Sequence, residues 1–114
     1  MAQYKYKVEN KDSGYIFVLY PNNSNTQPIG QSVKIANSYK ACLEQLNDFK
    51  NFVKSSNIKK CLMIDSSVEG KWYPSLVKED TKIFERKAAY TQGPFECQDW
   101  CERIIENIDS RITD

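Results

Sequence analysis

The chain has 114 residues, of which 40% are hydrophobic and 12% aromatic, as expected for one folded domain. Its 16 Lys and Arg residues nearly balance 15 Asp and Glu residues, so it lacks the dense basic clustering of dedicated nucleic-acid binders. It contains no histidine, which excludes Ser-His-Asp and Cys-His catalytic systems built within this chain. We expect a non-enzymatic protein without a metal or cofactor.

The N-terminus and the cysteines favour an intracellular protein. Residues 1–7 lack the apolar segment of a secretory signal, and no stretch approaches the roughly 20 apolar residues of a membrane span. The four cysteines of an unexported chain are expected to be reduced thiols. We therefore expect a soluble cytoplasmic protein that does not associate with membranes.

The first half of the chain predicts three strands followed by a helix. Alternating or β-branched and aromatic residues mark strands at residues 4–8, 15–20 and 28–35. A turn at residues 10–14 separates the first two strands. The helix is capped by Asn37 or Ser38 and ends near residues 55–57. Its apolar stripe consists of Cys42, Leu46, Phe49 and Val53.

The second half predicts the same order of elements. Strands are expected at residues 60–65, 71–77 and 83–90. Residues 92–94 begin a helix, because proline is preorganised for a first helical turn. The apolar stripe of this helix consists of Cys97, Cys101, Ile104 and Ile108. The chain is therefore one domain, 1–114, with internal repeats at approximately residues 1–57 and 58–114.

Individual residues support this duplication. Residues 14–17 (Gly-Tyr-Ile-Phe) recur as residues 70–73 (Gly-Lys-Trp-Tyr), and Cys42 is matched 55 positions later by Cys97. Short turns between strands imply antiparallel pairing, and joining the halves would remove an exposed sheet edge. We predict an α+β fold in which two tandem βββα units form one antiparallel six-stranded sheet with two helices packed on one face.

The second repeat carries a recognisable pattern. A glycine is followed by an aromatic and a hydrophobic residue two and six positions on, at Gly70, Trp72 and Leu76. A second strand, an aromatic residue and a helix containing Ala or Cys come next. This pattern resembles the YegP-like family of small bacterial proteins. The resemblance implies a six-stranded antiparallel sheet with two helices on one side, and it implies no established activity.

The pair Cys97 and Cys101 invites a redox or zinc interpretation. Its spacing places both sulfurs on one helical face, whereas redox and zinc motifs use Cys-x-x-Cys. Both residues also continue an apolar stripe, and Cys42 occupies the equivalent position in the first helix. We favour buried small hydrophobes. A four-cysteine metal site that includes Cys61, or a regulatory thiol, is the alternative.

The function hypothesis that we favour is a small protein-interaction module, of accessory or inhibitor type. It would use the exposed sheet face, an edge strand or the acidic second helix. Trp100 lies outside the apolar stripe, so an exposed Trp is predicted as an interface anchor, together with Phe95, Glu96 and Asp99. The partner would be another protein, and the chain would be a monomer or a homodimer through a sheet edge at residues 4–8 or 83–90.

Nucleic-acid or nucleotide binding is the alternative function. Basic residues predicted on the sheet face opposite the helices would hold phosphate while aromatic residues stack on bases. The basic residues are Lys5, Lys7, Lys34, Lys71, Arg86 and Lys87. The aromatic residues are Tyr15, Phe17 and Tyr73. A solvated outer face that prevents edge-to-edge pairing would show the same pattern.

Overall fold

A computed structural model describes residues 4–21 and 27–113. The strands are β1 (Lys5–Lys11), β2 (Gly14–Tyr20), β3 (Gly30–Ser32), β4 (Leu62–Asp65), β5 (Tyr73–Lys78), β6 (Thr81–Glu85) and β7 (Arg111–Ile112). The helices are α1 (Tyr39–Ser55), the short 3-10 helix η1 (Ile58–Cys61) and α2 (Phe95–Glu106). The predicted α+β class and the repeated βββα order are both confirmed.

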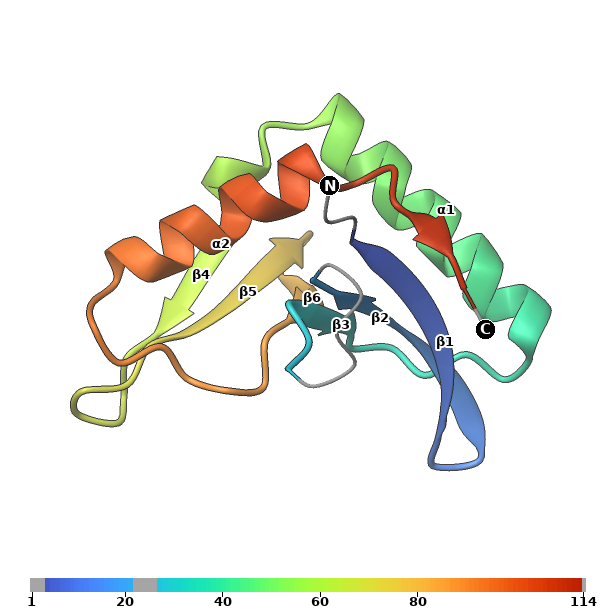
Figure 1. Cartoon of the computed structure of the whole chain (residues 1–114), viewed down its shortest axis with the longest axis horizontal. Coiled ribbons are helices and arrows are strands. Elements are labelled where there is room, and N and C mark those ends of the chain that lie inside the picture. The colour runs from blue at the N-terminus through green and yellow to red at the C-terminus, as the bar shows by residue number, and fades with distance from the viewer. Residues whose placement is uncertain (1–3, 22–26, 114) are drawn as a thin grey trace.

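All the strands belong to one sheet, in the order β4-β5-β6-β3-β2-β1-β7. The pairing of β3 with β6 joins the two halves, and each pair among β1 to β6 is antiparallel. Both helices lie on the same side of this sheet (Figure 1). We call the opposite side the helix-free face. The two helices are therefore packed on one face, as predicted.

The sheet has one strand more than predicted. β7 follows α2 and pairs in parallel with β1, so the sheet is mixed rather than wholly antiparallel. Of the two segments proposed for edge dimerisation, residues 83–90 do not lie at an edge, because β6 lies between β5 and β3. β7 pairs with β1 only at Lys5 and Tyr6. Among the described residues, free edges are therefore left along β4 and along β1 beyond Tyr6.

The third strand of each half is shorter than its apolar residues suggest. β3 covers three residues of the predicted 28–35, and β6 ends at Glu85 instead of continuing to residue 90. Beyond these points only isolated bridges remain, from Tyr15 to Ala36 and from Trp72 to Tyr90. These bridges also make Tyr15 the counterpart of Trp72. In the structure, residue 15 thus corresponds to residue 72, whereas the sequence alignment of residues 14–17 with 70–73 matches residue 15 with residue 71.

The helices bury the stripes that their periodicity predicts. The Ser38 hydroxyl caps α1 by accepting a hydrogen bond from the Ala41 amide at 3.1 Å. α2 begins directly after Pro94. The stripe residues of both helices are between 0% and 6% exposed, including Ile108, which lies just beyond the end of α2. Burial of these apolar side chains fixes both helices against the sheet.

The centre of the core is a row of aromatic rings at the junction of the two halves. The Phe84 ring stacks on Phe49 with centroids 4.6 Å apart, on Phe17 at 5.9 Å and on Trp100 at 6.1 Å. Gly30 makes room for it, because a Cβ at that position would lie 2.4 Å from a Phe84 ring carbon. Phe84 therefore occupies space that a side chain at position 30 would need.

Two tight turns connect strands within the halves. Asp12 and Ser13 join β1 to β2, and Glu79 and Asp80 join β5 to β6. All four residues have positive φ, between 49° and 66°, which matches the right-handed twist of a hairpin closed by two left-handed residues. Polar residues of this kind tolerate that conformation better than bulky ones. In the part of the chain that the structure describes, no helix is long and apolar enough to cross a membrane.

Candidate functional site

The prediction that Trp100 is an exposed interface anchor on α2 is wrong. Its side chain is 0% exposed, and its indole N–H donates to the Ile29 carbonyl at 2.6 Å. The hydrogen bond satisfies the one polar group of the ring, so Trp100 can be buried at the junction of the halves. The apolar stripe of α2 is thus wider than the steps of four and three suggest. Trp100 is a core residue and cannot contact a partner.

The other predicted residues of α2 remain near the surface. Phe95 is 57% exposed at the start of the helix, and Asp99 is exposed. Glu96 is half-buried and accepts a hydrogen bond from the Gln92 amide at 3.2 Å. That contact fixes the residues just before the helix. Only Phe95 and Asp99 of the predicted set are therefore exposed enough to contact a partner.

The predicted basic residues do not form one row. Alternation with the buried Tyr6 places Lys5 and Lys7 on the helix-free face of β1. Arg86 is half-buried, with its guanidinium 3.9 Å from the centre of the Tyr90 ring. Lys87 pairs with Glu85 at 3.0 Å. Lys71 also lies outside a common row, because it is exposed in the connection between β4 and β5.

Two of the three predicted aromatic residues do not lie on the helix-free face. Phe17 belongs to the core beneath the helices, and Tyr15 packs against the same core and meets the Tyr39 ring edge-on. Tyr73 does lie on the helix-free face, because it alternates with the buried Pro74 and pairs with Asp65. The interleaved row of basic and aromatic residues is therefore wrong for Tyr15 and Phe17.

The cysteines behave mainly as small hydrophobes. Cys42, Cys97 and Cys101 are at most 1% exposed, and all four cysteines are free thiols. Burial raises the pKa of each of these three thiols, that of Cys101 to about 11. They are therefore protonated and poorly nucleophilic at neutral pH. The interpretation as core packing is confirmed for these three residues.

The helix-free face has an apolar centre that sequence reasoning missed. Ile16, Val18 and Tyr20 of β2 are at most 8% exposed and form a cluster separate from the main core. The continuous hydrophobic run of β2 is the sequence signal, since a strand with one solvated face would alternate. Register places Lys7 beside Val18 and, on the other side, Gln31 beside Val18. Polar side chains therefore border the cluster on both sides.

A charged contact anchors one end of this cluster. The Tyr20 hydroxyl donates to Glu9 Oε2 at 2.5 Å. Burial, followed by the hydrogen bond and the negative charge of Glu9, raises the pKa of Tyr20 to about 12. The phenol therefore stays neutral at physiological pH and holds the β1 carboxylate against the sheet.

The segment between β3 and α1 exposes large apolar side chains to solvent. Val33, Ile35 and Tyr39 are 37%, 39% and 42% exposed. They account for three of the seven exposed large hydrophobic residues found among residues 4–21 and 27–113. A Cβ on Gly14 would lie 2.3 Å from Ile35 Cγ2, which places Ile35 directly beside the end of β2. We call Val33, Ile35 and Tyr39 the apolar segment.

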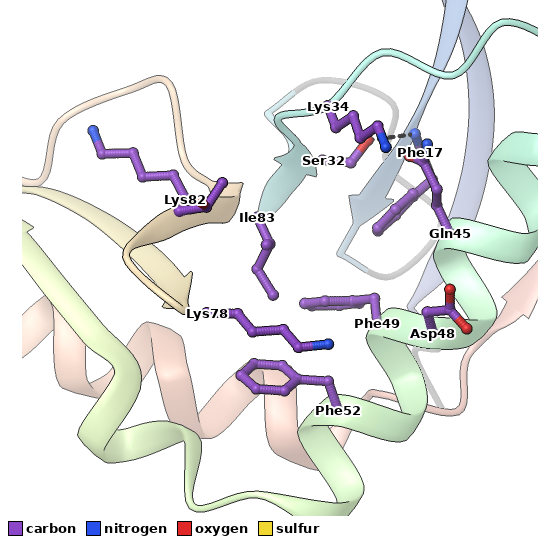
Figure 2. A pocket seen from close by; sticks show the side chains of 11 residues that line it. Phe17, Ser32, Lys34, Gln45, Asp48, Phe49, Phe52, Lys78, Lys82 and Ile83 are labelled. Atoms are coloured by element: carbon purple, nitrogen blue, oxygen red, sulfur yellow. Dashed lines mark hydrogen bonds between the residues drawn. The ribbon is translucent and has the colours of Figure 1, made fainter.

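A pocket of about 290 Å³ lies on the other side of the sheet, between α1 and the β5–β6 hairpin (Figure 2). Aromatic and aliphatic side chains line its interior, and polar residues line its rim. The apolar residues are Phe17, Phe49, Phe52 and Ile83. The polar residues are Ser32, Lys34, Gln45, Asp48, Lys78, Thr81 and Lys82. Nothing in the sequence brings these residues together, because they come from both halves.

The lysine side chains at the rim of the pocket point in different directions. Lys78 extends into the pocket with its ammonium 5.4 Å from the centre of the Phe52 ring. Lys82 points away from the pocket (Figure 2). The pKa of Asp65 on the helix-free face is lowered mainly by hydrogen bonds from Ser67, and the charge of Lys82 adds to this effect. Of these two lysines, Lys78 is therefore the one placed to contact a molecule in the pocket.

The fold resembles two solved structures of bacterial proteins. The solution NMR structure of yegP from E. coli, a protein of unknown function, matches with a TM-score of 0.73 and 14% identity, covering 100% of this chain and 94% of that one. The UPF0339 protein SO3888 from Shewanella oneidensis matches with a TM-score of 0.71 and 15% identity, covering 98% and 91%. No family model and no curated protein matches the sequence. The predicted likeness to YegP is confirmed as a likeness of fold.

Proposed function

We propose that this protein is a small, non-enzymatic protein-interaction module that binds its partner through the apolar segment. The observation that carries the proposal is the exposure of Val33, Ile35 and Tyr39 within seven residues. Large apolar side chains that are exposed together, and bordered by polar ones, are typical of protein-binding surfaces.

The surroundings of this surface support a protein partner. Ile16 and Val18 of β2 are buried, whereas Lys7 and Glu9 on β1, which pair with Val18 and Ile16, are partly exposed and supply charges of both signs. Mixed charge around an apolar centre provides orientation and specificity more than affinity. Such a rim fits the surface of another protein better than a uniformly negative polymer.

A site-specific photo-crosslinker tests the proposal. Benzoylphenylalanine replaces Val33 in one variant and Asn51, an exposed residue of α1 on the helix side, in the control. Irradiation in cells of the source organism should yield a discrete crosslinked partner from position 33 and none from position 51. Adding Ile35→Asp to the first variant should abolish the product while the melting temperature changes little. Equal products from both positions would contradict the proposal.

Nucleic-acid binding is the second candidate, because Lys5 and Lys7 follow one another along the helix-free face of β1. It predicts an affinity for DNA or RNA that falls steeply with salt, by up to about one power of salt concentration for each phosphate contact. The Lys7→Glu variant should weaken binding, and Lys40→Glu, at an exposed lysine of α1, serves as the control. Fluorescence anisotropy with labelled oligonucleotides that stays flat at low salt would eliminate this candidate.

A further inference from the structure

We propose that the pocket beside Gln45 binds a planar aromatic group that carries a negative charge. The site lies on the helix-covered side of the sheet, and it adjoins the surface proposed for a protein partner at Lys34, between Val33 and Ile35. Its interior is formed by the rings of Phe49 and Phe52 together with Ile83. The proposal has two parts, the shape of the ligand and its charge.

The internal repeat supplies the argument about shape. Gln45 lies three residues after Cys42, and Trp100 lies three residues after Cys97, so the two residues occupy equivalent positions on α1 and α2. Trp100 is fully buried with its indole N–H on the Ile29 carbonyl. An indole therefore fills this position on α2, whereas α1 has a half-buried Gln45 at the edge of an open pocket.

Strand register shows that the surroundings are equivalent as well. Leu19 pairs with Gly30 in the first half, and Leu76 pairs with Phe84 in the second. The residues one position earlier, Ile29 and Ile83, are therefore counterparts. Ile29 contacts Trp100, and Ile83 lines the pocket beside Gln45. The pocket is thus the place where the first half lacks the indole of the second, and a flat ring of that size matches it.

The rim supplies the argument about charge. Lys78 reaches across the Phe52 ring into the pocket, and Lys34 lines the opposite rim. Among the described residues no carboxylate lies within salt-bridge distance of either ammonium. Asp48 is the one acidic residue that lines the pocket. Two lysines against one carboxylate favour an anion, and an ammonium beside an aromatic ring is suited to hold a carboxylate over a bound ring.

Indole-3-propionate and tryptamine are matched probes, because they share the ring and differ in the sign of the charge. Each is titrated into the 15N-labelled protein while backbone amide shifts around Gln45, Phe49 and Ile83 are followed by NMR. Indole-3-propionate should give saturable shifts at these positions with a dissociation constant below about 10 mM. Tryptamine should bind at least about fivefold more weakly, as expected for loss of one partly exposed ion pair.

Three variants separate the two parts of the proposal. Gln45→Trp, which fills the pocket from within, should abolish the shifts. Lys78→Met keeps the apolar stem but removes the charge, and should weaken indole-3-propionate about fivefold without weakening tryptamine. Lys71→Met, at an exposed lysine outside the pocket, should change nothing.

The outcomes are distinguishable. If indole-3-propionate gave no saturable shifts in the wild-type protein, the proposal would be overturned. Equal affinity for the two probes, or equal effects of Lys78→Met and Lys71→Met, would overturn its charge part. If Gln45→Trp did not fold, the Lys78→Met comparison would still decide the question, because Lys78 is exposed at the surface.

Discussion

The two halves of this protein have the same order of strands and helix but differ in which side of each unit is apolar. On the helix side, α2 buries Trp100 where α1 has the half-buried Gln45. On the helix-free face, β2 buries Ile16, Val18 and Tyr20. In β5 the corresponding positions hold Tyr73, Ser75 and Val77. The first half therefore has an apolar outer face and an open pocket, whereas the second has a filled core and a more polar outer face.

This difference shows how a duplicated unit can diversify. The stripes that hold helix to sheet are kept in both halves, because every helix needs an apolar face to be buried. Positions beside the stripes tolerate either a polar or an apolar residue. Gln45 and Trp100 are such a pair, and their divergence leaves one half with an open pocket at a position that the other half fills.

The largest expected effect is the loss of Trp100. Trp100→Ala removes a fully buried ring and leaves a cavity beside Phe84, so it should lower the free energy of unfolding by about 3–5 kcal/mol. The matched change in the first half, Gln45→Ala, should cost no more than about 0.5 kcal/mol. Urea unfolding followed by circular dichroism measures both. Similar costs at the two positions would show that the halves do not differ in this way.

The second prediction concerns Gly30 and Phe84, which occupy equivalent positions in the two halves. Gly30→Ala places a Cβ 2.4 Å from the Phe84 ring, and should cost about 1–3 kcal/mol through overpacking. Combining it with Phe84→Leu should relieve part of this cost, because the smaller side chain removes the crowding atoms. A double-mutant cycle measures the coupling between the two substitutions. Strictly additive costs would show that a side chain at position 30 and the Phe84 ring do not compete for the same space.

The tight turns give a smaller effect of opposite sign. Ser13 in the first half and Asp80 in the second have φ of 66° and 65°, where glycine avoids the steric cost borne by other residues. Ser13→Gly should stabilise the protein by about 0.5 kcal/mol. Asp80→Gly should gain less, because aspartate tolerates the left-handed region. Glu44→Gly in α1 is the control and should cost about 1 kcal/mol.

The last prediction concerns the part of the pH dependence that comes from Tyr20 in the first half. The pKa of Tyr20 is raised from about 10 to about 12 in the folded protein, so its contribution to stability is complete below pH 10. That contribution is lost as the pH rises from 10 to 12, because the unfolded chain ionises more readily. Urea midpoints at pH 9 and pH 11 should therefore differ more for the wild-type protein than for Tyr20→Phe. An unchanged difference would show that ionisation of Tyr20 has no such role.

The fold could be predicted from the sequence to a large extent because its signals are local. Each helical stripe follows directly from the spacing of Cys42, Leu46, Phe49 and Val53 and of their counterparts. Both helices and the strand order within each half were therefore found. The parallel strand β7 was missed, because two exposed residues pair with β1 only after α2 has brought them there.

The candidate sites depended on contacts between the halves. Hydrophobic periodicity in the sequence determined that this chain forms two amphipathic helices over one sheet, since burial of an apolar stripe is a property of each helix alone. Whether Trp100 is exposed, which cations share a surface and where the pocket opens were decided by the pairing of β3 with β6. That pairing brings Ile29 to α2 and Ile83 to α1, and packing of this kind joins residues that no local pattern connects.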